Sequence, residues 1–334
     1  MTKPRLSVLG IGNAIVDIIA DADDAFIARR GLTKGAMKLI DGEEAGSLYQ
    51  ALGIGAARES SGGSVANTIA GIAALGGKAG FIGKVRNDLL GKIFSNDLTS
   101  MGVVFPTKPA TDGADTARCI ILVTPDAQRT MNTYLGACAS LGAEDIDADL
   151  VRSAEITYLE GYLYDPPAAK EAFHKAAEIA HAAGRKVALS LSDAFCVERH
   201  RAAFLDLVEK HVDILFANEA EITSLYQCDF DQAVSRVRGA CGLAALTRSA
   251  EGSVVVTAEE VIAVPAAKVT RVIDTTGAGD LYAAGFLYGL TTGRSLKTCA
   301  QLGGLCAGEI ISHYGARPEA DLAVLVAPIL IDDK

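Results

Sequence analysis

Between residues 155 and 249 the sequence alternates apolar runs with amphipathic segments, and this alternation limits the fold more than any other feature. We expect strands at EITYLEGYL (155–163), KVALSLS (186–192), VDILFAN (212–218) and LAALTRS (243–249). Helices are expected between them: one begun by prolines and ended by Gly184, one over 197–210, and others through 241. Apolar strands joined by amphipathic helices are typical of a parallel sheet covered on both faces. The sequence therefore predicts an α/β fold, with three α/β/α layers and a mostly parallel central sheet.

Two segments, 18–45 and 103–136, interrupt this alternation with short β-like runs. TARCIILVT (116–124) and RTMNTYL (129–135) predict a hairpin whose turn contains Pro125 and Asp126. Such insertions favour a small β-rich lid over one edge of the main sheet, although ordinary surface hairpins would give the same pattern. We therefore treat 1–334 as a single domain that carries this lid. Short β-rich runs are expected over 253–274, and helices from 280 onward.

Composition excludes several classes of protein. The formal net charge of −10 at pH 7 argues against nucleic acid as a partner, because phosphate contacts dominate that affinity. No apolar run is long enough to span a membrane, and the N-terminal 20 residues predict a buried first strand instead of a signal peptide. Seven scattered cysteines without a CxxC pattern predict reduced thiols and a cytoplasmic location.

The segment VIDTTGAGDLYAAGFLYGL (272–290) carries the strongest chemical signal. A β-branched run leads directly into an apolar helix, whose first backbone N–H groups lack intrahelical partners and form an anion site. Gly277 and Gly279 allow a ligand to approach the backbone closely. Asp280, near the helix start, could accept a proton from a hydroxyl, and together these groups suit phosphoryl transfer to an alcohol. Helix capping by Asp280 is the structural alternative.

Other nucleotide-binding motifs are weak or missing. The sequence has no GxxxxGK[ST], so a P-loop is excluded. GIGNAI (10–15) has the first two glycines of a dinucleotide fingerprint but not the third, and it continues into the strand-like VDIIA. A dehydrogenase of the Rossmann type is therefore disfavoured.

Two distant motifs together resemble the ribokinase-like (PfkB) carbohydrate and nucleoside kinases. DTTGAGD (274–280) resembles their C-terminal signature, and SGGSVANTIAGIAALGGKAGFIGKVRNDLLG (61–91) resembles their N-terminal one. The resemblance extends over nearly the whole chain and implies a large α/β domain with a small β lid. Within the family, GNAIVDI (12–18) and QRTMNTYLGA (128–137) resemble adenosine kinases in particular.

The resemblance implies roles around the acceptor hydroxyl. Asp280 would be the base for the 5′-hydroxyl of a nucleoside. The backbone N–H groups of residues 277–280 (Gly277, Ala278, Gly279 and Asp280) would hold the transferring phosphoryl group. The ribose hydroxyls would be held by Asp17, Gly63 and Asn67, with Asn13 nearby. A carboxylate that accepts from two vicinal hydroxyls rejects ligands without them, because its own buried oxygens would then be unpaired.

The resemblance also implies roles on the lid and around ATP. Arg129 would reach the ATP phosphates when the lid closes, and Met131 and Thr133 would line the purine site. Asn218 and Glu221 match an N-x-x-E pattern that organises Mg²⁺ through water. A solvated arginine and a helix cap are the respective structural alternatives.

The remaining expectations concern the nucleotide and a second cation. Thr247 and Gly252 match a T-x-G-x-x-G stretch that contacts the nucleotide, although Ser249 stands where a glycine is common. Asp274 and Thr276 match positions that bind a monovalent cation, such as K⁺, in many relatives, with carbonyls near 309–315 completing the shell.

We therefore expect an ATP- and Mg²⁺-dependent kinase that phosphorylates the 5′-hydroxyl of adenosine. A PfkB kinase for a free sugar, such as ribose or a ketohexose, is the alternative, because the motifs at 61–67 and 274–280 fit it equally well. A sensor that binds a nucleoside without turnover is disfavoured, since it has no need of the base Asp280. GTP as donor, and a monomer or a homodimer, remain open.

Overall fold

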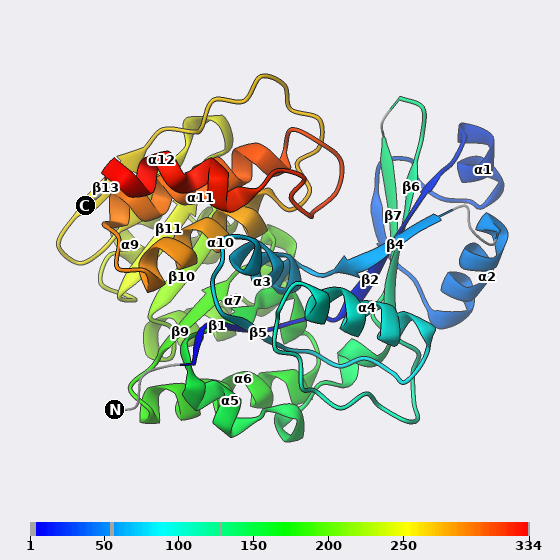
Figure 1. Ribbon diagram of the computed structural model, residues 1–334, viewed down its shortest axis with the longest axis horizontal. Coiled ribbons are helices and arrows are strands. Elements are labelled where there is room, and N and C mark those ends of the chain that lie inside the picture. Colours follow the sequence, from blue (N-terminus) through cyan, green and yellow to red (C-terminus); the bar gives the residue numbers. More distant parts are fainter. Residues whose placement is uncertain (1–4, 54–56, 127, 333–334) are drawn as a thin grey trace.

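The computed structural model describes residues 5–53, 57–126 and 128–332, and these form two β-sheets (Figure 1). The larger sheet has eight strands in the order β13-β12-β11-β10-β9-β8-β1-β5. Their bounds are β1 (Leu6–Ile11), β5 (Ala79–Ile82), β8 (Ala154–Glu160), β9 (Lys186–Ser190), β10 (Ile214–Asn218), β11 (Leu243–Thr247), β12 (Ser253–Val256) and β13 (Val261–Val264). All pairs from β5 to β11 are parallel, and β12 and β13 are added antiparallel. The predicted mostly parallel sheet is confirmed.

Helices cover both faces of this sheet and create two apolar cores. One face packs against α3 (Ser64–Ala74), α10 (Ala278–Thr291), α11 (Leu296–Ile310) and α12 (Leu322–Asp332), with α4 (Leu89–Ser100) beside them. The other face packs against α5 (Ala148–Ser153), α6 (Pro167–Ala182), α7 (Ala194–Lys210), α8 (Glu219–Tyr226) and α9 (Phe230–Val237). The three-layer α/β/α prediction is therefore confirmed. In the described segments, no helix combines the length and apolar character needed to cross a membrane.

The smaller sheet has the strand order β3-β7-β6-β2-β4 and stands beside the large domain (Figure 1). Its strands are β2 (Ile15–Asp21), β3 (Met37–Leu39), β4 (Ala57–Gly62), β6 (Ala117–Val123) and β7 (Arg129–Tyr134). β6 and β7 pair antiparallel, as the predicted hairpin requires; Ala127 of its turn lies outside the described residues. The sheet takes in β4, which lies outside the ranges 18–45 and 103–136. The N-terminal segment, expected as one strand, divides at Gly12–Ala14 into β1 and β2, which belong to different sheets.

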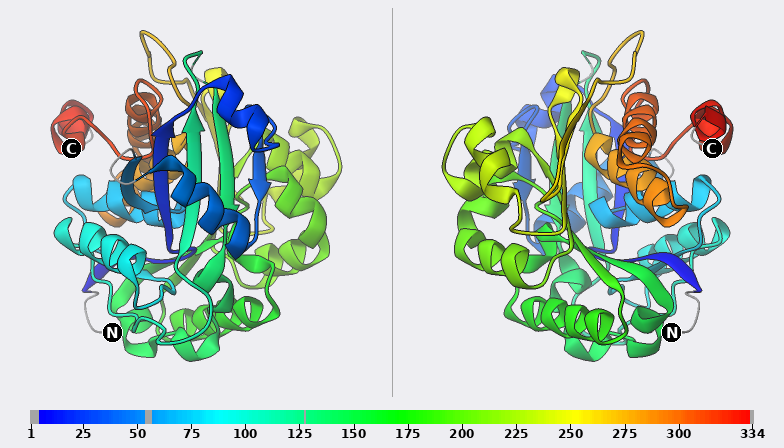
Figure 2. Two further views of the ribbon diagram at one scale, coloured as in Figure 1. Left: turned by 90° about the vertical axis from the view of Figure 1, so that its right-hand side faces the viewer. Right: turned by 90° about the vertical axis from the view of Figure 1, so that its left-hand side faces the viewer.

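The two faces of the small sheet differ in character. The outer face buries Val16, Ile18 and Ile120 under α1 (Asp24–Arg29) and α2 (Gly42–Leu52), the helices in front of the sheet in the left view of Figure 2. Strand side chains alternate between faces, so the neighbours of these residues point the other way. The strand register places Asp17, Cys119, Thr133 and Leu39 side by side in one row, and Ile19, Ile121, Met131 and Met37 in the next.

Candidate active site

Polar side chains collect where the parallel strands of the large sheet end. Asn13 follows β1, Glu160 ends β8, Asn218 ends β10 and Thr247 ends β11. The carboxyl ends of parallel strands share one edge, where ligands bind in open α/β sheets. The small sheet lies beside this edge (Figure 1), so groups from both sheets meet there.

The 274–280 segment forms the predicted turn into α10. Gly277 is the N-cap with φ +79°, a left-handed conformation suited to glycine, and a Cβ at this position would lie 3.0 Å from Ala316 Cβ. A Cβ on Gly279 would meet nothing within 4 Å, so the approach to the helix end is open on that side. The Ala278 N–H already donates to Thr275 O (3.2 Å). The expected set of N–H donors therefore loses Ala278, while Gly279 and Asp280 lie in the first turn of α10, where N–H groups have no intrahelical partner.

Asp280 does not cap its own helix, so the capping interpretation is wrong. Its carboxylate turns toward α3, where Oδ1 accepts from Ser64 Oγ (2.6 Å) and Oδ2 from Asn67 Nδ2 (2.9 Å). Burial raises the pKa of Asp280 to about 6, against the opposing effects of Ser64, Asn67 and the nearby Arg317. The pKa of this carboxyl group therefore lies much closer to neutral pH than that of an ordinary aspartate, a shift that is common at functional sites.

Asp17 approaches the same place from the small sheet. Burial raises its pKa to about 6, Arg317 opposes this, and the negative charge of Asp280 raises it further. A Cβ at position 62 would lie 2.4 Å from the Asp17 carboxylate, so a larger residue than Gly62 would displace that carboxylate. The next residue, Gly63, has φ +94° and begins α3. The structure thus brings Asp17, Gly63, Asn67 and Asp280 close together.

Asn13 is nearby, but its side chain has another partner. The buried carboxylate of Glu160 accepts from Asn13 Nδ2 (2.7 Å), Asn13 N (3.3 Å) and Val65 N (3.0 Å). Burial raises the pKa of Glu160 to about 7. Sequence analysis missed Glu160, although an acidic residue as the last residue of an apolar strand was a usable signal. Glu160 ties β8 to the N-terminus of α3 and so fixes the helix that carries Asn67.

Replacing Glu160 with alanine should lower the free energy of unfolding by about 2–4 kcal/mol, because three buried N–H donors would lose their acceptor. Relief of the buried charge offsets part of this loss, since the raised pKa shows that ionisation is costlier in the folded state. Denaturant unfolding at pH 8 measures the change, with exposed Glu198→Ala as the control. Equal stability of both variants would show that the Glu160 contacts contribute nothing.

Arg129 of β7 contacts the large domain directly. Its Nη1 lies 2.8 Å from Asp274 Oδ2, and its guanidinium lies 5.3 Å from the ring centre of Tyr314. Its Nε and Nη2 are buried and have no hydrogen-bond partner among the described residues. Two guanidinium nitrogens are therefore left for an acceptor that the described part of the chain does not supply.

Asp274 and Thr276, expected at a monovalent-cation site, are used differently. Thr276 N (3.1 Å) and Oγ1 (2.8 Å) donate to Asp274 Oδ1, while Gly315 N (2.9 Å) and Arg129 approach Oδ2. The carbonyl of Ile311, in the loop expected to complete the shell, accepts from Ile273 N (2.8 Å). With donors at both oxygens and a guanidinium already present, this carboxylate does not fit a K⁺ ligand, and we assign no cation to it.

Asn218 and Glu221 form a capping box at the start of α8. Asn218 Oδ1 accepts from Glu221 N (2.9 Å), and the Glu221 carboxylate accepts from Asn218 N (2.9 Å) and Nδ2 (2.6 Å). Burial, together with the negative charges of Asp193 and Asp280, raises the pKa of Glu221 to about 7. No cluster of three or more His, Cys, Asp or Glu within the described ranges could hold a metal ion directly. The negative charges of Glu221, Asp193 and Asp280 nevertheless suit a hydrated divalent ion, because such an ion needs few direct protein ligands.

Residues 247–252, where nucleotide contacts are expected, turn sharply after β11. Thr247 lies opposite Asn218 in the β10–β11 register. Gly252 has φ +90°, and a Cβ there would lie 2.1 Å from Val264 O. Ser249 takes a left-handed φ of +48°, which explains why glycine is common at this position.

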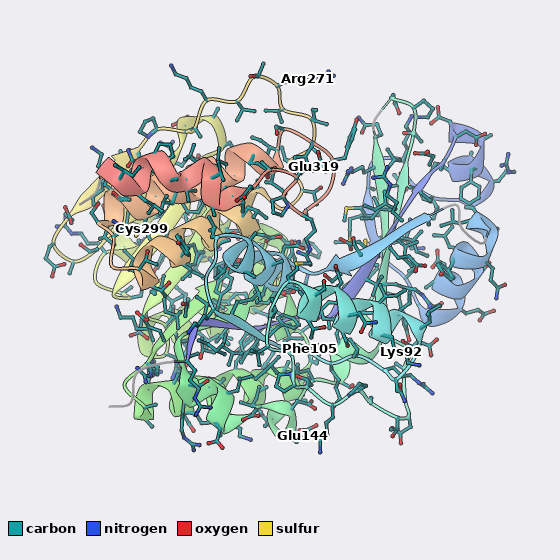
Figure 3. All side chains as sticks on the ribbon, viewed as in Figure 1. Lys92, Phe105, Glu144, Arg271, Cys299 and Glu319 are labelled. Atoms are coloured by element: carbon teal, nitrogen blue, oxygen red, sulfur yellow. The ribbon has the colours of Figure 1, made fainter. Side chains whose placement is uncertain are left out.

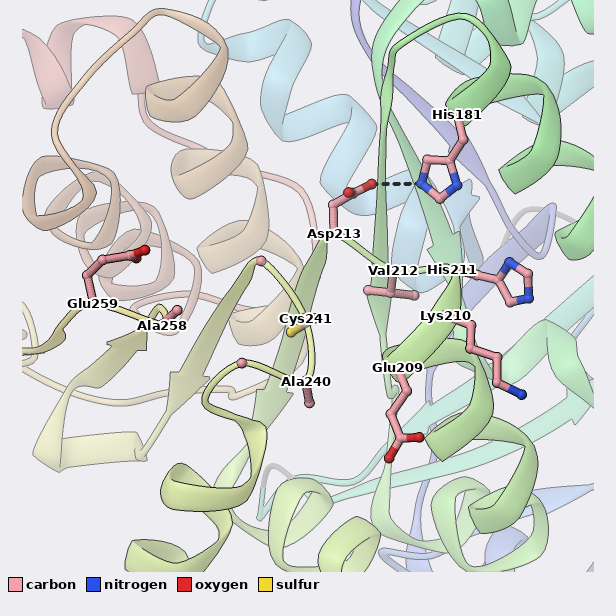
Figure 4. Close-up of a pocket in the computed structure, with 12 residues that line it drawn as sticks. His181, Glu209, Lys210, His211, Val212, Asp213, Ala240, Cys241, Ala258 and Glu259 are labelled. Carbon is pink, nitrogen blue, oxygen red and sulfur yellow. Dashed lines mark hydrogen bonds and ion pairs between the residues drawn. The ribbon is translucent and has the colours of Figure 1, made fainter.

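Two further features lie outside the cluster of side chains around Asp280. The loops that carry Arg271 and Glu319 lie on the side of the large domain that faces the small sheet (Figure 3). A cavity of about 480 Å³ lies elsewhere, at the amino ends of β10 and β11 (Figure 4). Its Asp213 accepts from Val187 N (2.7 Å) and pairs with His181 (3.0 Å), so it is already satisfied.

Comparisons with known proteins agree with this architecture. The pfkB family carbohydrate kinase profile matches residues 53–322. A solved adenosine kinase from Sinorhizobium meliloti is 52% identical, with a TM-score of 0.88, covering 97% of this chain and 99% of its own. A probable sugar kinase from Rhizobium etli CFN 42 is 50% identical, with a TM-score of 0.89, covering 97% and 98%. An ATP-dependent ribose-1-phosphate kinase from Halopiger xanaduensis is 30% identical over 268 residues, or 79% of this chain and 85% of the relative. The chain therefore belongs to the PfkB family of carbohydrate kinases and is a phosphotransferase with a hydroxyl acceptor.

Proposed function

We propose that the protein transfers the γ-phosphoryl group of ATP to the 5′-hydroxyl of adenosine, giving AMP and ADP. The observation that carries the proposal is the meeting of Asp17 from the small sheet with Asp280 at the start of α10. One carboxylate suits a vicinal diol, and the other suits the hydroxyl that is phosphorylated. A ribose bound between them presents both groups.

On the acceptor side, Asp280 is the proposed base. Its carboxylate is fixed by Ser64 and Asn67, so it can orient the 5′-hydroxyl and take its proton without reorganising. Asp17 is the proposed ligand of the 2′- and 3′-hydroxyls, with Gly63 and Asn67 beside it. Asn13 would act only indirectly, because its side-chain amide already donates to Glu160.

On the donor side, the N–H groups at the start of α10 would hold the moving phosphoryl group. The unpaired Nε and Nη2 of Arg129 would donate to phosphate oxygens, while Nη1 stays on Asp274. Kinases of the family use ATP and Mg²⁺ in general. Glu221 and Asn218 would hold Mg²⁺ through water, and the ion would neutralise phosphate charge. Thr247 and Gly252 are the proposed nucleotide contacts.

The inner face of the small sheet favours a nucleoside over a free sugar. Beyond Asp17, this face presents Thr133 and Met131, then the exposed side chains of Leu39 (54%) and Met37 (55%). Exposed apolar side chains beside a diol-binding carboxylate suit a ligand that is polar at one end and flat and apolar at the other. A purine nucleoside has this form, whereas ribose would leave the apolar residues uncovered.

A substrate panel tests the proposal directly. With ADP release as the readout, adenosine should show a kcat/KM at least about 100-fold above ribose or a ketohexose, because those sugars lack the apolar base. A preference for a free sugar would instead establish the sugar-kinase alternative. Binding without turnover of any acceptor would indicate a sensor.

The apolar face has its own test within the panel. Leu39→Ser should raise the KM for adenosine by about tenfold, in line with roughly one lost apolar contact. The change should leave kcat nearly unaltered, since Leu39 is remote from the transferred group. Val261→Ser removes an equally exposed apolar side chain from β13 and serves as the matched control. An unchanged KM for adenosine in Leu39→Ser would show that the purine ring of adenosine binds elsewhere.

A further inference from the structure

Arg317 belongs to none of the sequence motifs, yet its side chain ends among the groups around Asp280. It lies in the loop between α11 and α12, immediately before Pro318. Its Nη1 donates to Asn67 Oδ1 (2.5 Å), and its Nη2 donates to Ser61 O (2.8 Å) and Ser61 Oγ (2.6 Å). One guanidinium thus joins the C-terminal loop to α3 and to the end of β4.

We infer that Arg317 is a positioning residue for phosphoryl transfer, and that it acts on Asp280 through the amide of Asn67. A guanidinium can only donate, so it holds the amide oxygen toward itself. The amide nitrogen is then directed at Asp280 Oδ2, at 2.9 Å. Without Arg317, the carboxylate of Asp280 would be the partner left to orient this amide, and both groups would be held less firmly. The inference rests on the proposed role of Asp280, and not on adenosine as the acceptor.

The surroundings hold Arg317 firmly in this position. Ser61, its partner, is itself fixed to Asp97 through Ser61 N (2.9 Å) and Ser61 Oγ (2.5 Å). The two residues before Arg317 contact the 274–280 segment. Gly315 N donates to Asp274 Oδ2 (2.9 Å), and Ala316 packs against Gly277. The loop over 315–317 therefore contacts both the turn before α10 and the Asn67 amide, which donates to the Asp280 carboxylate.

The charge of Arg317 acts in the same direction. Six charged or titratable groups of the described residues interact electrostatically with Asp280: Asp17 of β2, Tyr158 and Glu160 of β8, Tyr162 after it, Glu221 of α8, and Arg317. Of these groups Arg317 alone is cationic, and it favours the ionised form of Asp280. Removal of Arg317 should therefore affect both the orientation of the base and its proton affinity.

The first test is Arg317→Gln. We expect kcat to fall by about 10–100-fold with a smaller change in acceptor KM, because the proposed diol ligand Asp17 stays in place. The acid limb of the kcat–pH profile should move upward by roughly one unit, since an opposite charge is lost. Arg152→Gln, an exposed arginine of α5, should leave both unchanged. An unmoved acid limb with kcat within about threefold of wild type would overturn the inference.

The second test asks whether Arg317 acts through Asn67. If it does, adding Arg317→Gln to Asn67→Ala should lower kcat little further at a pH above the acid limb, where the direct charge effect on Asp280 no longer changes its ionisation. Two independent, multiplying losses at that pH would overturn the inference. Should Arg317→Gln not fold, Arg317→Lys enters the same cycle, because it keeps the charge but not the fork of donors. The ratios of kcat between each variant and wild type are measured with whichever acceptor the wild type phosphorylates. The wild-type substrate preference thus reports on the proposed function, and the ratios report on Arg317.

Discussion

Replacing Asp280 with asparagine should lower kcat by about 10²–10⁴-fold while leaving the fold intact. An amide cannot take the proton of the acceptor hydroxyl at neutral pH, although it has the same shape. The free energy of unfolding should change by no more than about 1.5 kcal/mol. Ser64 can still donate to the amide oxygen, and the loss at Asn67 is offset by removal of a buried charge. Rates of ADP release and denaturant unfolding on the same preparation measure both quantities.

Asp229→Asn is the matched control for this variant. Asp229 caps α9 through Gln232 N (2.9 Å), and asparagine caps helices as well as aspartate does. The control should therefore retain both turnover and stability. If Asp280→Asn keeps its activity within a few-fold of wild type, Asp280 is not the base, and the proposed mechanism fails with it.

Sequence alone predicted those parts of the molecule that local rules govern. The alternation over residues 155–249 and the hairpin at 116–135 were sufficient, because apolar periodicity and turn residues act within a few positions. β4 was missed for the converse reason. Its sequence, ARESSG, has little intrinsic preference for a strand, and pairing with β2 imposes the extended conformation.

In the candidate site, too, some features could be predicted from the sequence and others could not. The resemblance to PfkB kinases singled out Asp280, Asn67 and Asp17, and the fold brings these three residues close together. It did not reveal which atoms the protein already uses: Asn13 is committed to Glu160, and Asp274 to Arg129. Arg317 gave no local signal, since it meets Asn67 across 250 positions of sequence.

Replacing Asp17 with alanine should lower kcat/KM for adenosine by about 10²–10⁴-fold. Each hydrogen bond from a ribose hydroxyl to the ionised carboxylate is worth roughly 1.5–3 kcal/mol, and two would be lost. The variant should also lose discrimination against 2′,3′-dideoxyadenosine, because that substrate never makes these bonds. Comparing kcat/KM for the two nucleosides in wild type and variant measures the effect.

Stability separates this binding role from a structural one. The raised pKa of Asp17 means that its folded state holds the proton more tightly than the unfolded chain, so above the ordinary value of 3.8 ionisation counts against folding. Asp17→Ala should therefore not lower the free energy of unfolding at pH 7. Asp21→Ala, an exposed carboxylate at the end of the same strand, should leave catalysis unchanged. If Asp17→Ala still prefers adenosine to its dideoxy analogue by the wild-type ratio, other groups hold the diol, and the pairing of Asp17 with Asp280 is no longer evidence for a nucleoside.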